Sequence, residues 1–171
     1  MTSLSASEKG LAFELWVRRL FDELGVLRVR HDVYLSRKDR FGRSTSQIDL
    51  VYGLFSSRYV ECKYHEPGKK VPLEDVSKFA SVLRLQGIPL KKGMMVTNTS
   101  YHIRAQQYAR QTKMILVDRE KLVRLDWKRT YMFRSLIQAP TKAFDEGLEE
   151  RIKEEFLFMR GRGEMKRSYR R

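Results

Sequence analysis

Hydrophobic and polar residues follow two different periods near the start of the chain. Between Gly10 and Gly25 the apolar side chains recur every three or four positions, which predicts an amphipathic helix. The preceding Ser5-Ala6-Ser7-Glu8 has the form of a capping box, and Gly25 predicts the end of the helix. Residues 26–35 alternate between apolar and polar, so we expect a strand there, followed by a polar loop over residues 36–46.

Two short apolar runs follow and predict an antiparallel hairpin. They cover residues 47–54 and 58–64, and only a few residues centred near Phe55 separate them. Helical and strand patterns then alternate. We expect a helix over 72–87, a strand over 93–98, a helix over 100–112 capped by Ser100, and a strand over 114–118. This order predicts a mixed α/β fold.

The C-terminal part of the chain is helical and then basic. An apolar stripe within residues 144–159 predicts a helix that packs on the domain or on a partner; it consists of Leu148, Ile152, Phe156 and Met159. Residues 160–171 contain six basic residues and one acidic residue, which is typical either of an arm that grips phosphates or of a solvated tail. We therefore predict a domain over 8–126, a helical extension over 127–159 and a basic flexible tail over 160–171.

The net charge indicates a polyanionic partner. The 171 residues include 35 Lys and Arg against 21 Asp and Glu, which gives a formal charge of +14. Such a charge favours nucleic acid as the partner, although a basic surface without a partner and a membrane-surface protein have the same composition. Residues 28–43 alone carry six basic and two acidic residues, so we interpret this segment as a flank that faces phosphates.

Cysteine content and hydropathy limit where the protein works. A single cysteine, Cys62, excludes an internal disulfide framework and a multi-cysteine zinc site, and it favours a reducing compartment. No apolar stretch is long enough to span a membrane, so we expect no membrane partner. We predict an intracellular protein of the cytoplasm or nucleoid, or of an organellar matrix if a presequence has been removed.

The predicted hairpin brings two acids and a lysine to one face. Asp49 lies roughly opposite Glu61, and the alternation of side chains along a strand places Lys63 on the same face. Opposed carboxylates destabilise a hairpin unless a positive charge compensates them. A divalent cation, Mg²⁺ or Mn²⁺, is the natural compensator because it prefers hard oxygen ligands, and the backbone carbonyl of Cys62 offers another oxygen.

These residue types suit phosphodiester hydrolysis. Asp49 and Glu61 would hold a metal that polarises the phosphate and lowers the pKa of a bound water. Lys63 would either orient or activate that water, or stabilise the negative charge of the transition state. Gln47 shares the Asp49 face, and His65 lies two residues beyond Lys63, as an accessory proton carrier or phosphate contact or as an ordinary polar residue at a strand end. Ordinary cross-strand ion pairs are the alternative interpretation of the whole cluster.

The order of these motifs resembles the PD-(D/E)xK nuclease superfamily, in its Mrr-type branch. The likeness spans about residues 8–125 and consists of an early helix with GLAFE, then QIDLV, YVECKY and GMMVTN, then an Ala-rich helix and MILVD. It implies a restriction-endonuclease-like fold, a mixed central sheet flanked by helices, with Asp49 and Glu61 as metal ligands and Lys63 as the catalytic lysine. It also implies that Glu14 is the first-helix acid near or within the metal shell.

Two positions depart from the Mrr-type pattern. Residues 43–47 stand where these enzymes usually carry a Gly-rich stretch, and Ile48 replaces the proline expected before the motif aspartate. Neither change removes a metal ligand, but both bear on how closely DNA approaches the site.

Together these observations predict a Mg²⁺-dependent nuclease that cuts phosphodiester bonds in DNA, expected to be an endonuclease. One alternative is a non-cleaving nucleic-acid-binding protein on the same fold, within a DNA-maintenance or ribonucleoprotein assembly; the C-terminal extension favours it. The other is a Holliday-junction or other structure-specific resolvase, for which a homodimer would supply two active sites.

Overall fold

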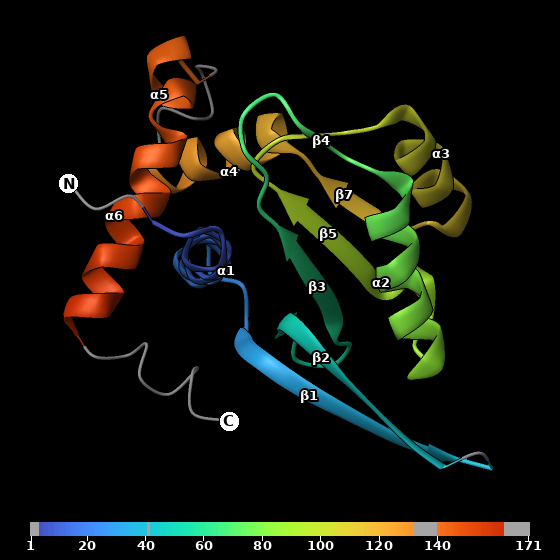
Figure 1. Ribbon diagram of the computed structural model, residues 1–171. Helices are drawn as coiled ribbons and strands as arrows, with labels where there is room; N and C mark the ends of the chain where they lie inside the picture. The colour runs from blue at the N-terminus through green and yellow to red at the C-terminus, as the bar shows by residue number, and fades with distance from the viewer. Residues whose placement is uncertain (1–3, 41, 132–139, 163–171) are drawn as a thin grey trace.

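A mixed β-sheet forms the centre of the fold. The computed structural model describes residues 4–40, 42–131 and 140–162, and within them five strands form a sheet in the order β1-β2-β3-β5-β7 (Figure 1). Antiparallel pairing joins the first three strands, and parallel pairing joins β3, β5 and β7. The strands are β1 (Arg30–Asp39), β2 (Gly42–Tyr52), β3 (Arg58–Lys63), β5 (Gly93–Thr97) and β7 (Ile115–Val117).

Helices cover both faces of this sheet and enclose two apolar clusters. One cluster joins the sheet to α1 (Ala6–Glu23), α4 (Arg119–Thr130) and α6 (Leu148–Gly161). The other joins it to α2 (Leu73–Leu85) and α3 (Ile103–Thr112), which lie to the right of the sheet in Figure 1. The predicted mixed α/β sheet flanked by helices is therefore confirmed. None of the helices in the described part of the chain is long and apolar enough to cross a membrane.

The first helix begins and ends as its sequence predicts. Ser5 is the N-cap, its hydroxyl accepts a hydrogen bond from the Glu8 backbone N–H, and the Glu8 side chain completes the capping box. Beyond the last turn Gly25 adopts a positive φ of 76°, which glycine tolerates without strain. The buried face of α1 includes the wholly enclosed Phe13 and Val17, so this helix is anchored along its length.

The polar segment predicted as a loop is instead most of a long hairpin. β1 and β2 pair without interruption from Val33 with Ile48 to Asp39 with Gly42, so the loop expected over residues 36–46 is wrong. The prediction failed because the outer side chains are polar on both faces of the two strands, and no apolar period marks them as β-structure. The turn closes next to Gly42, whose φ of 129° suits glycine.

The cap predicted for the helix after β5 is also wrong. Ser100 belongs to β6 (Ser100–Tyr101), which pairs in parallel with β4 (Lys70–Val71). The helix α3 begins three residues later, and His102 is its N-cap. A two-residue strand has too little pattern to be seen in the sequence, and its pairing with a distant segment decided the local structure.

The C-terminal helices pack against the first helix. The structure interrupts the predicted helix at Gly147, which separates α5 (Lys142–Glu146) from α6. Leu148, Ile152 and Phe156 of α6 are buried in the cluster that also holds the apolar face of α1. The predicted domain boundaries stay a prediction. The boundary between residues 126 and 127 falls within α4. Residues 163–171 of the predicted tail lie outside the described residues.

Because Phe156 is wholly enclosed, Phe156→Ala should lower the free energy of unfolding by about 3–5 kcal/mol. Leu157 is 52% exposed in the same helix, so Leu157→Ala should cost less than about 0.5 kcal/mol and serves as the control. Urea denaturation of the two variants measures the difference. Equal costs would mean that α6 is not part of the cooperative core.

Candidate active site

Strands β2 and β3 separate at Asp49. Their paired residues run from Tyr52 with Arg58 to Leu50 with Val60, which places the turn near Phe55 as predicted. Continuing this register brings Asp49 opposite Glu61. The ladder has ended there, and Asp49 Oδ2 accepts the backbone N–H of Cys62 at 2.7 Å. The separation gives the Asp49 carboxylate room beside the end of β3.

The neighbouring backbone is distorted at the same level. Asp32 on β1 has a positive φ of 55°, and Ile48 and Leu50 pack in the two different apolar clusters although they have the same parity along the strand. The strand therefore twists sharply at Asp49. Gln47, predicted to share the Asp49 face, donates a hydrogen bond from Nε2 to Asp32 Oδ1 at 2.6 Å.

Glu61 and Lys63 form an ion pair at the end of β3. Lys63 Nζ lies 2.9 Å from Glu61 Oε1, and the two side chains are 36% and 20% exposed. Burial lowers the pKa of the Lys63 ammonium, but the charge and hydrogen bond of Glu61 outweigh it, so the pKa of Lys63 is raised. Burial also raises the pKa of Glu61 despite its partner. The lysine is therefore a protonated cation at neutral pH.

The first helix brings a third acid to this cluster. Glu14 is on α1, its Oε2 lies 3.1 Å from Nε2 of His31 on β1, and its side chain is 26% exposed. The charge of Glu14 raises the pKa of both Asp49 and Glu61, so the three carboxylates interact electrostatically. The sequence pattern identified Glu14 only through a family resemblance, and it gave no sign that His31 would be its partner.

Negative charge is in excess at Asp49. Burial, followed by the charges of Glu61 and Glu14, raises the pKa of Asp49 to about 8, while the Cys62 N–H and Lys63 lower it by less. A carboxyl with such a pKa stays protonated at neutral pH unless a cation approaches. One lysine is thus too little positive charge for this group of acids.

His65 and Cys62 lie on either side of these acids. His65 Nε2 is 3.7 Å from Oδ2 of Asp75, an acid in the first turn of α2 whose charge reaches both Glu61 and Lys63. The Cys62 thiol is buried in the cluster under α1, and burial raises its pKa well above the usual value, so the thiol is no nucleophile. Asp75 was missed because an acid in a first helical turn is ordinary.

The donor set suits a hydrated divalent ion. Among the described residues, no three His, Cys, Asp or Glu side chains are grouped closely enough to hold a metal by themselves. Mg²⁺, however, is commonly bound through one or two carboxylates and retains several waters. Asp49, Glu61 and the Cys62 carbonyl fit that requirement, since they offer hard oxygens where negative charge lacks compensation.

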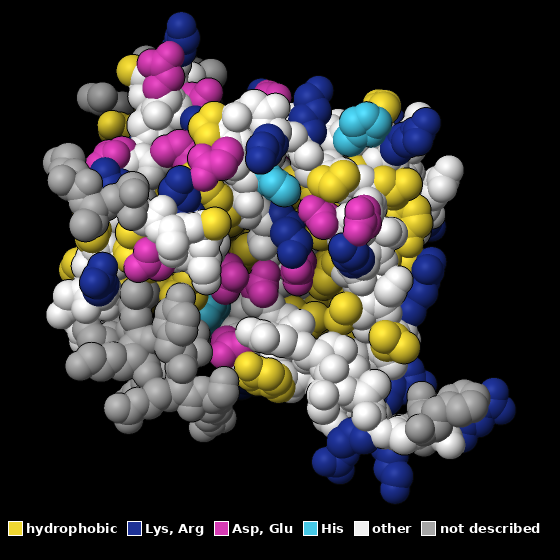
Figure 2. Space-filling view, in the orientation of Figure 1, with side chains coloured by type: hydrophobic (Ala, Val, Ile, Leu, Met, Phe, Trp, Pro, Cys, Tyr) yellow, Lys and Arg dark blue, Asp and Glu magenta, His cyan; other side chains and the backbone are white. Residues whose placement is uncertain are grey.

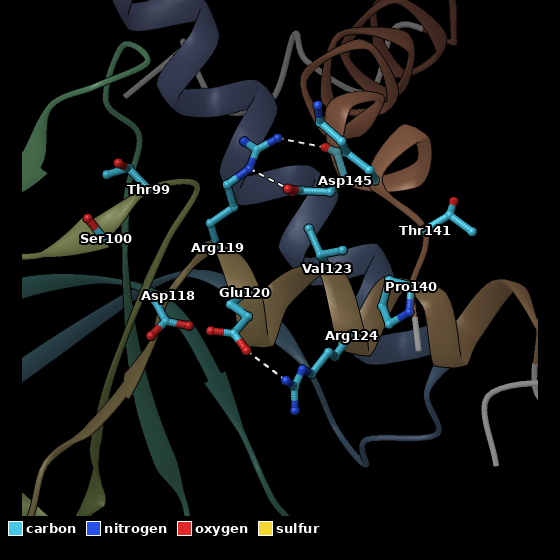
Figure 3. Close-up of a pocket in the computed structure, with 11 residues that line it drawn as sticks. Thr99, Ser100, Asp118, Arg119, Glu120, Val123, Arg124, Pro140, Thr141 and Asp145 are labelled. Carbon is cyan, nitrogen blue, oxygen red and sulfur yellow. Dashed lines mark hydrogen bonds and ion pairs between the residues drawn. The ribbon is translucent and has the colours of Figure 1, made fainter. Parts of the chain in front are cut away.

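Acidic side chains gather on one face of the molecule, and the residues predicted for the site do not line the cavity beside α4. Figure 2 shows Asp and Glu side chains gathered near the middle of one face, with Lys and Arg at the far end of the β1–β2 hairpin. A cavity of about 690 Å³ lies instead between α4 and α5 (Figure 3). Arg119 closes one wall of it through an ion pair with Asp145 at 2.8 Å. None of the predicted site residues lines this cavity.

The chain belongs to the restriction endonuclease family Mrr_cat. The family model matches residues 6–125, which include the whole central sheet and all the acids of the candidate site. Membership confirms the resemblance seen in the sequence and supports a nuclease that acts on DNA. No curated protein matches the sequence.

Solved structures share the fold at low sequence identity. A protein of unknown function, AF1548, has a TM-score of 0.54 and 18% identity, with 88% of this chain and 96% of that chain covered. Can2 from Sulfobacillus thermosulfidooxidans in complex with cyclic tetra-adenylate has a TM-score of 0.50 and 19% identity, over 74% of this chain but 36% of that one. The MspJI restriction endonuclease in complex with a 27-mer oligonucleotide has a TM-score of 0.45 and 23% identity, with 85% of this chain and 32% of that chain covered. The first two share the fold of this chain.

The Asp49 pKa predicts a pH-dependent stability. The folded, metal-free protein keeps the Asp49 proton up to about pH 8, whereas the ordinary carboxyl pKa is 3.8. The native state therefore binds more protons than the unfolded chain between these values, and Asp49 contributes a loss of stability as the pH rises. Urea denaturation in EDTA should show Asp49→Asn gaining stability relative to wild type as the pH rises through this window. A difference that does not change with pH would contradict the assignment.

Proposed function

We propose that the protein is a divalent-metal-dependent endonuclease that hydrolyses phosphodiester bonds in DNA. Its active site would consist of Asp49, Glu61, Lys63 and Glu14. The observation that carries the proposal is the group of partly buried carboxylates whose charge Lys63 alone does not neutralise. Such a group costs stability in a protein that has no cation to bind there. Membership of a restriction endonuclease family supports the reaction class.

Asp49 and Glu61 would hold Mg²⁺ or Mn²⁺, with the Cys62 carbonyl as a further oxygen ligand. When bound, the ion polarises the scissile phosphate and lowers the pKa of a bound water. The hydrogen bond from Cys62 N–H to Asp49 Oδ2 orients the carboxylate, because it holds one oxygen toward the strand. Glu14 is anchored by His31 at 3.1 Å and adds negative charge from the opposite side.

Lys63 stabilises charge rather than accepting a proton. Its pKa is raised and its ammonium lies 2.9 Å from Glu61, so it stays protonated at neutral pH. A protonated lysine cannot act as a general base, but it donates hydrogen bonds to a water or to a phosphate oxygen. Of the two roles open to this residue, the electrostatics favour orienting the water and neutralising the transition state.

His65 would act indirectly, as a positioning residue. Its Nε2 is buried and has no hydrogen-bond partner among the described residues, and it lies 3.7 Å from Asp75. Because Asp75 interacts electrostatically with Glu61 and Lys63, this histidine borders the catalytic cluster without belonging to it.

The non-cleaving alternative explains the basic charge but not the carboxylates. A scaffold that only binds phosphates gains nothing from acids that repel them. The resolvase alternative needs two active sites, so it depends on the homodimer, which stays a prediction.

Purified protein should nick or linearise a covalently closed circular plasmid in the presence of Mg²⁺ or Mn²⁺, and EDTA should abolish this activity. A closed circle has no ends, so its cleavage requires an endonuclease. Glu61→Gln and Lys63→Ala should each lower the rate by about 10²–10³, since each removes a charge that acts on the transition state.

Glu120→Gln and Lys128→Ala remove the same charges from exposed positions on α4 and should cut at the wild-type rate. Cutting in EDTA, or cutting by Glu61→Gln at the wild-type rate, would refute the mechanism. Binding without turnover on any DNA would restore the non-cleaving alternative.

A further inference from the structure

The β1–β2 hairpin extends well beyond the rest of the sheet. Among the described residues, β3 pairs only with residues 50–52 of β2, so residues 42–48 of that strand pair with β1 alone. Gly42 and Ile48 are six residue steps apart along the strand, which corresponds to about 20 Å. Figure 1 shows this part of the hairpin, here called the arm (residues 33–48), projecting past α2.

The two faces of the arm have opposite character. One face is anchored: Ile48 is wholly buried in the cluster under α2, and the partly buried Val33 and Leu35 pack against that cluster. Farther out, Gln86 at the end of α2 donates to the Ser46 hydroxyl at 3.0 Å. The Arg37 guanidinium lies against Gly87, just after α2. These contacts tie the inner face of the arm to the end of α2.

The other face, here called the open face, is solvent-exposed along its whole length. Its members alternate along both strands and pair across the hairpin, and each is exposed: Tyr34 with Gln47, Ser36 with Thr45, and Lys38 with Arg43. The innermost member, Gln47, stands two residues before Asp49 on β2 and donates a hydrogen bond to Asp32 at 2.6 Å. The open face therefore runs from the basic end of the arm to the edge of the candidate active site.

Two facing cations near the end of the arm, Lys38 and Arg43, stand within a basic segment. Residues 37–43 include four basic residues and one acidic residue. Lys38 and Arg43 lie directly opposite each other, an arrangement that destabilises a hairpin. Neither forms an ion pair with any residue that the structure describes. A phosphate group between them would remove the repulsion.

We infer that the arm is a duplex-binding ribbon that lies in the major groove beside the scissile phosphate. This inference rests on the proposed nuclease function and names the surface that holds its substrate. The major groove is about 12 Å wide and accepts a two-stranded β-ribbon. The distance of about 20 Å between Arg43 and Asp49 corresponds to about six base-pair steps, so the arm contacts the duplex on one side of the scissile phosphate.

The chemistry of the open face fits a duplex better than a single strand. Proteins that bind single strands stack successive bases on several aromatic side chains. Among the described residues of the open face, Tyr34 is the aromatic one, and the others are hydroxyl, amide or cationic groups. Such groups contact phosphates and base edges in a groove.

The test compares duplex and single-stranded binding in EDTA, where no cleavage interferes. Fluorescence anisotropy would follow a labelled duplex of about 30 base pairs, and its single strand, between about 50 and 200 mM salt. Lys38→Ser/Arg43→Ser should weaken duplex binding about tenfold and lower the slope of log K against log salt by about 2. Single-strand binding should change less than about twofold, because the arm has no groove to enter.

Lys91→Ser/Arg110→Ser is the matched control, since it removes two exposed cations outside the arm. It should bind both DNAs like wild type. Equal losses for duplex and single strand in the arm variant, or an equal loss of duplex affinity in the control, would overturn the inference. The arm variant should melt no lower than wild type, because its substitutions are at exposed positions and remove the repulsion between Lys38 and Arg43.

Cleavage assays separate this inference from the proposed function. In Mg²⁺, the arm variant should cut duplex with a raised KM and an unchanged kcat. Hydroxyl-radical footprinting of wild type should show protection that extends about six base pairs to one side of the cut. If wild type cuts DNA but the arm variant keeps full duplex affinity, the role of the arm in binding is refuted and the nuclease proposal stands. A wild type that never cuts would refute the nuclease, whatever the arm binds.

Discussion

Repulsion between carboxylates at the point where β2 and β3 separate is the interaction on which the rest of the structure depends. Burial and the charges of Glu61 and Glu14 raise the pKa of Asp49 to about 8, and one lysine does not balance them. A fold that keeps such a group must hold the acids rigidly, because free side chains would turn toward water. The same charge also repels DNA, so the attraction for phosphates must come from elsewhere on the molecule.

The scaffold meets both needs with elements that are distant in sequence. Glu14 is fixed by the buried face of α1, and α6 packs behind that helix. Buried Asn98, just after β5, donates to the His65 carbonyl at 2.8 Å and to Glu149 of α6 at 3.1 Å. The C-terminal extension is thereby tied to the strand ends that carry the site. The basic arm supplies the attraction for phosphates at a distance from the acids.

The sequence predicted the elements whose pattern is local. The capping box at Ser5 and the hairpin turn near Phe55 follow from neighbouring residues, and the structure shows them. The ladder between β2 and β3 ends at Leu50, one residue before the predicted pair of Asp49 and Glu61. The outer hairpin and β6 were missed, because strands that are polar on both faces or two residues long carry no hydrophobic period. Asp75 and His31 were missed because only tertiary packing brings them to the cluster.

Manganese uptake tests the central claim most directly, because it needs neither DNA nor turnover. Electron paramagnetic resonance of free Mn²⁺, titrated with wild-type protein near pH 8, reports how much of the ion is bound. The account predicts saturable binding that weakens as the pH falls and Asp49 is protonated, and that is lost in Asp49→Asn. Equal uptake by wild type and Asp49→Asn would contradict it.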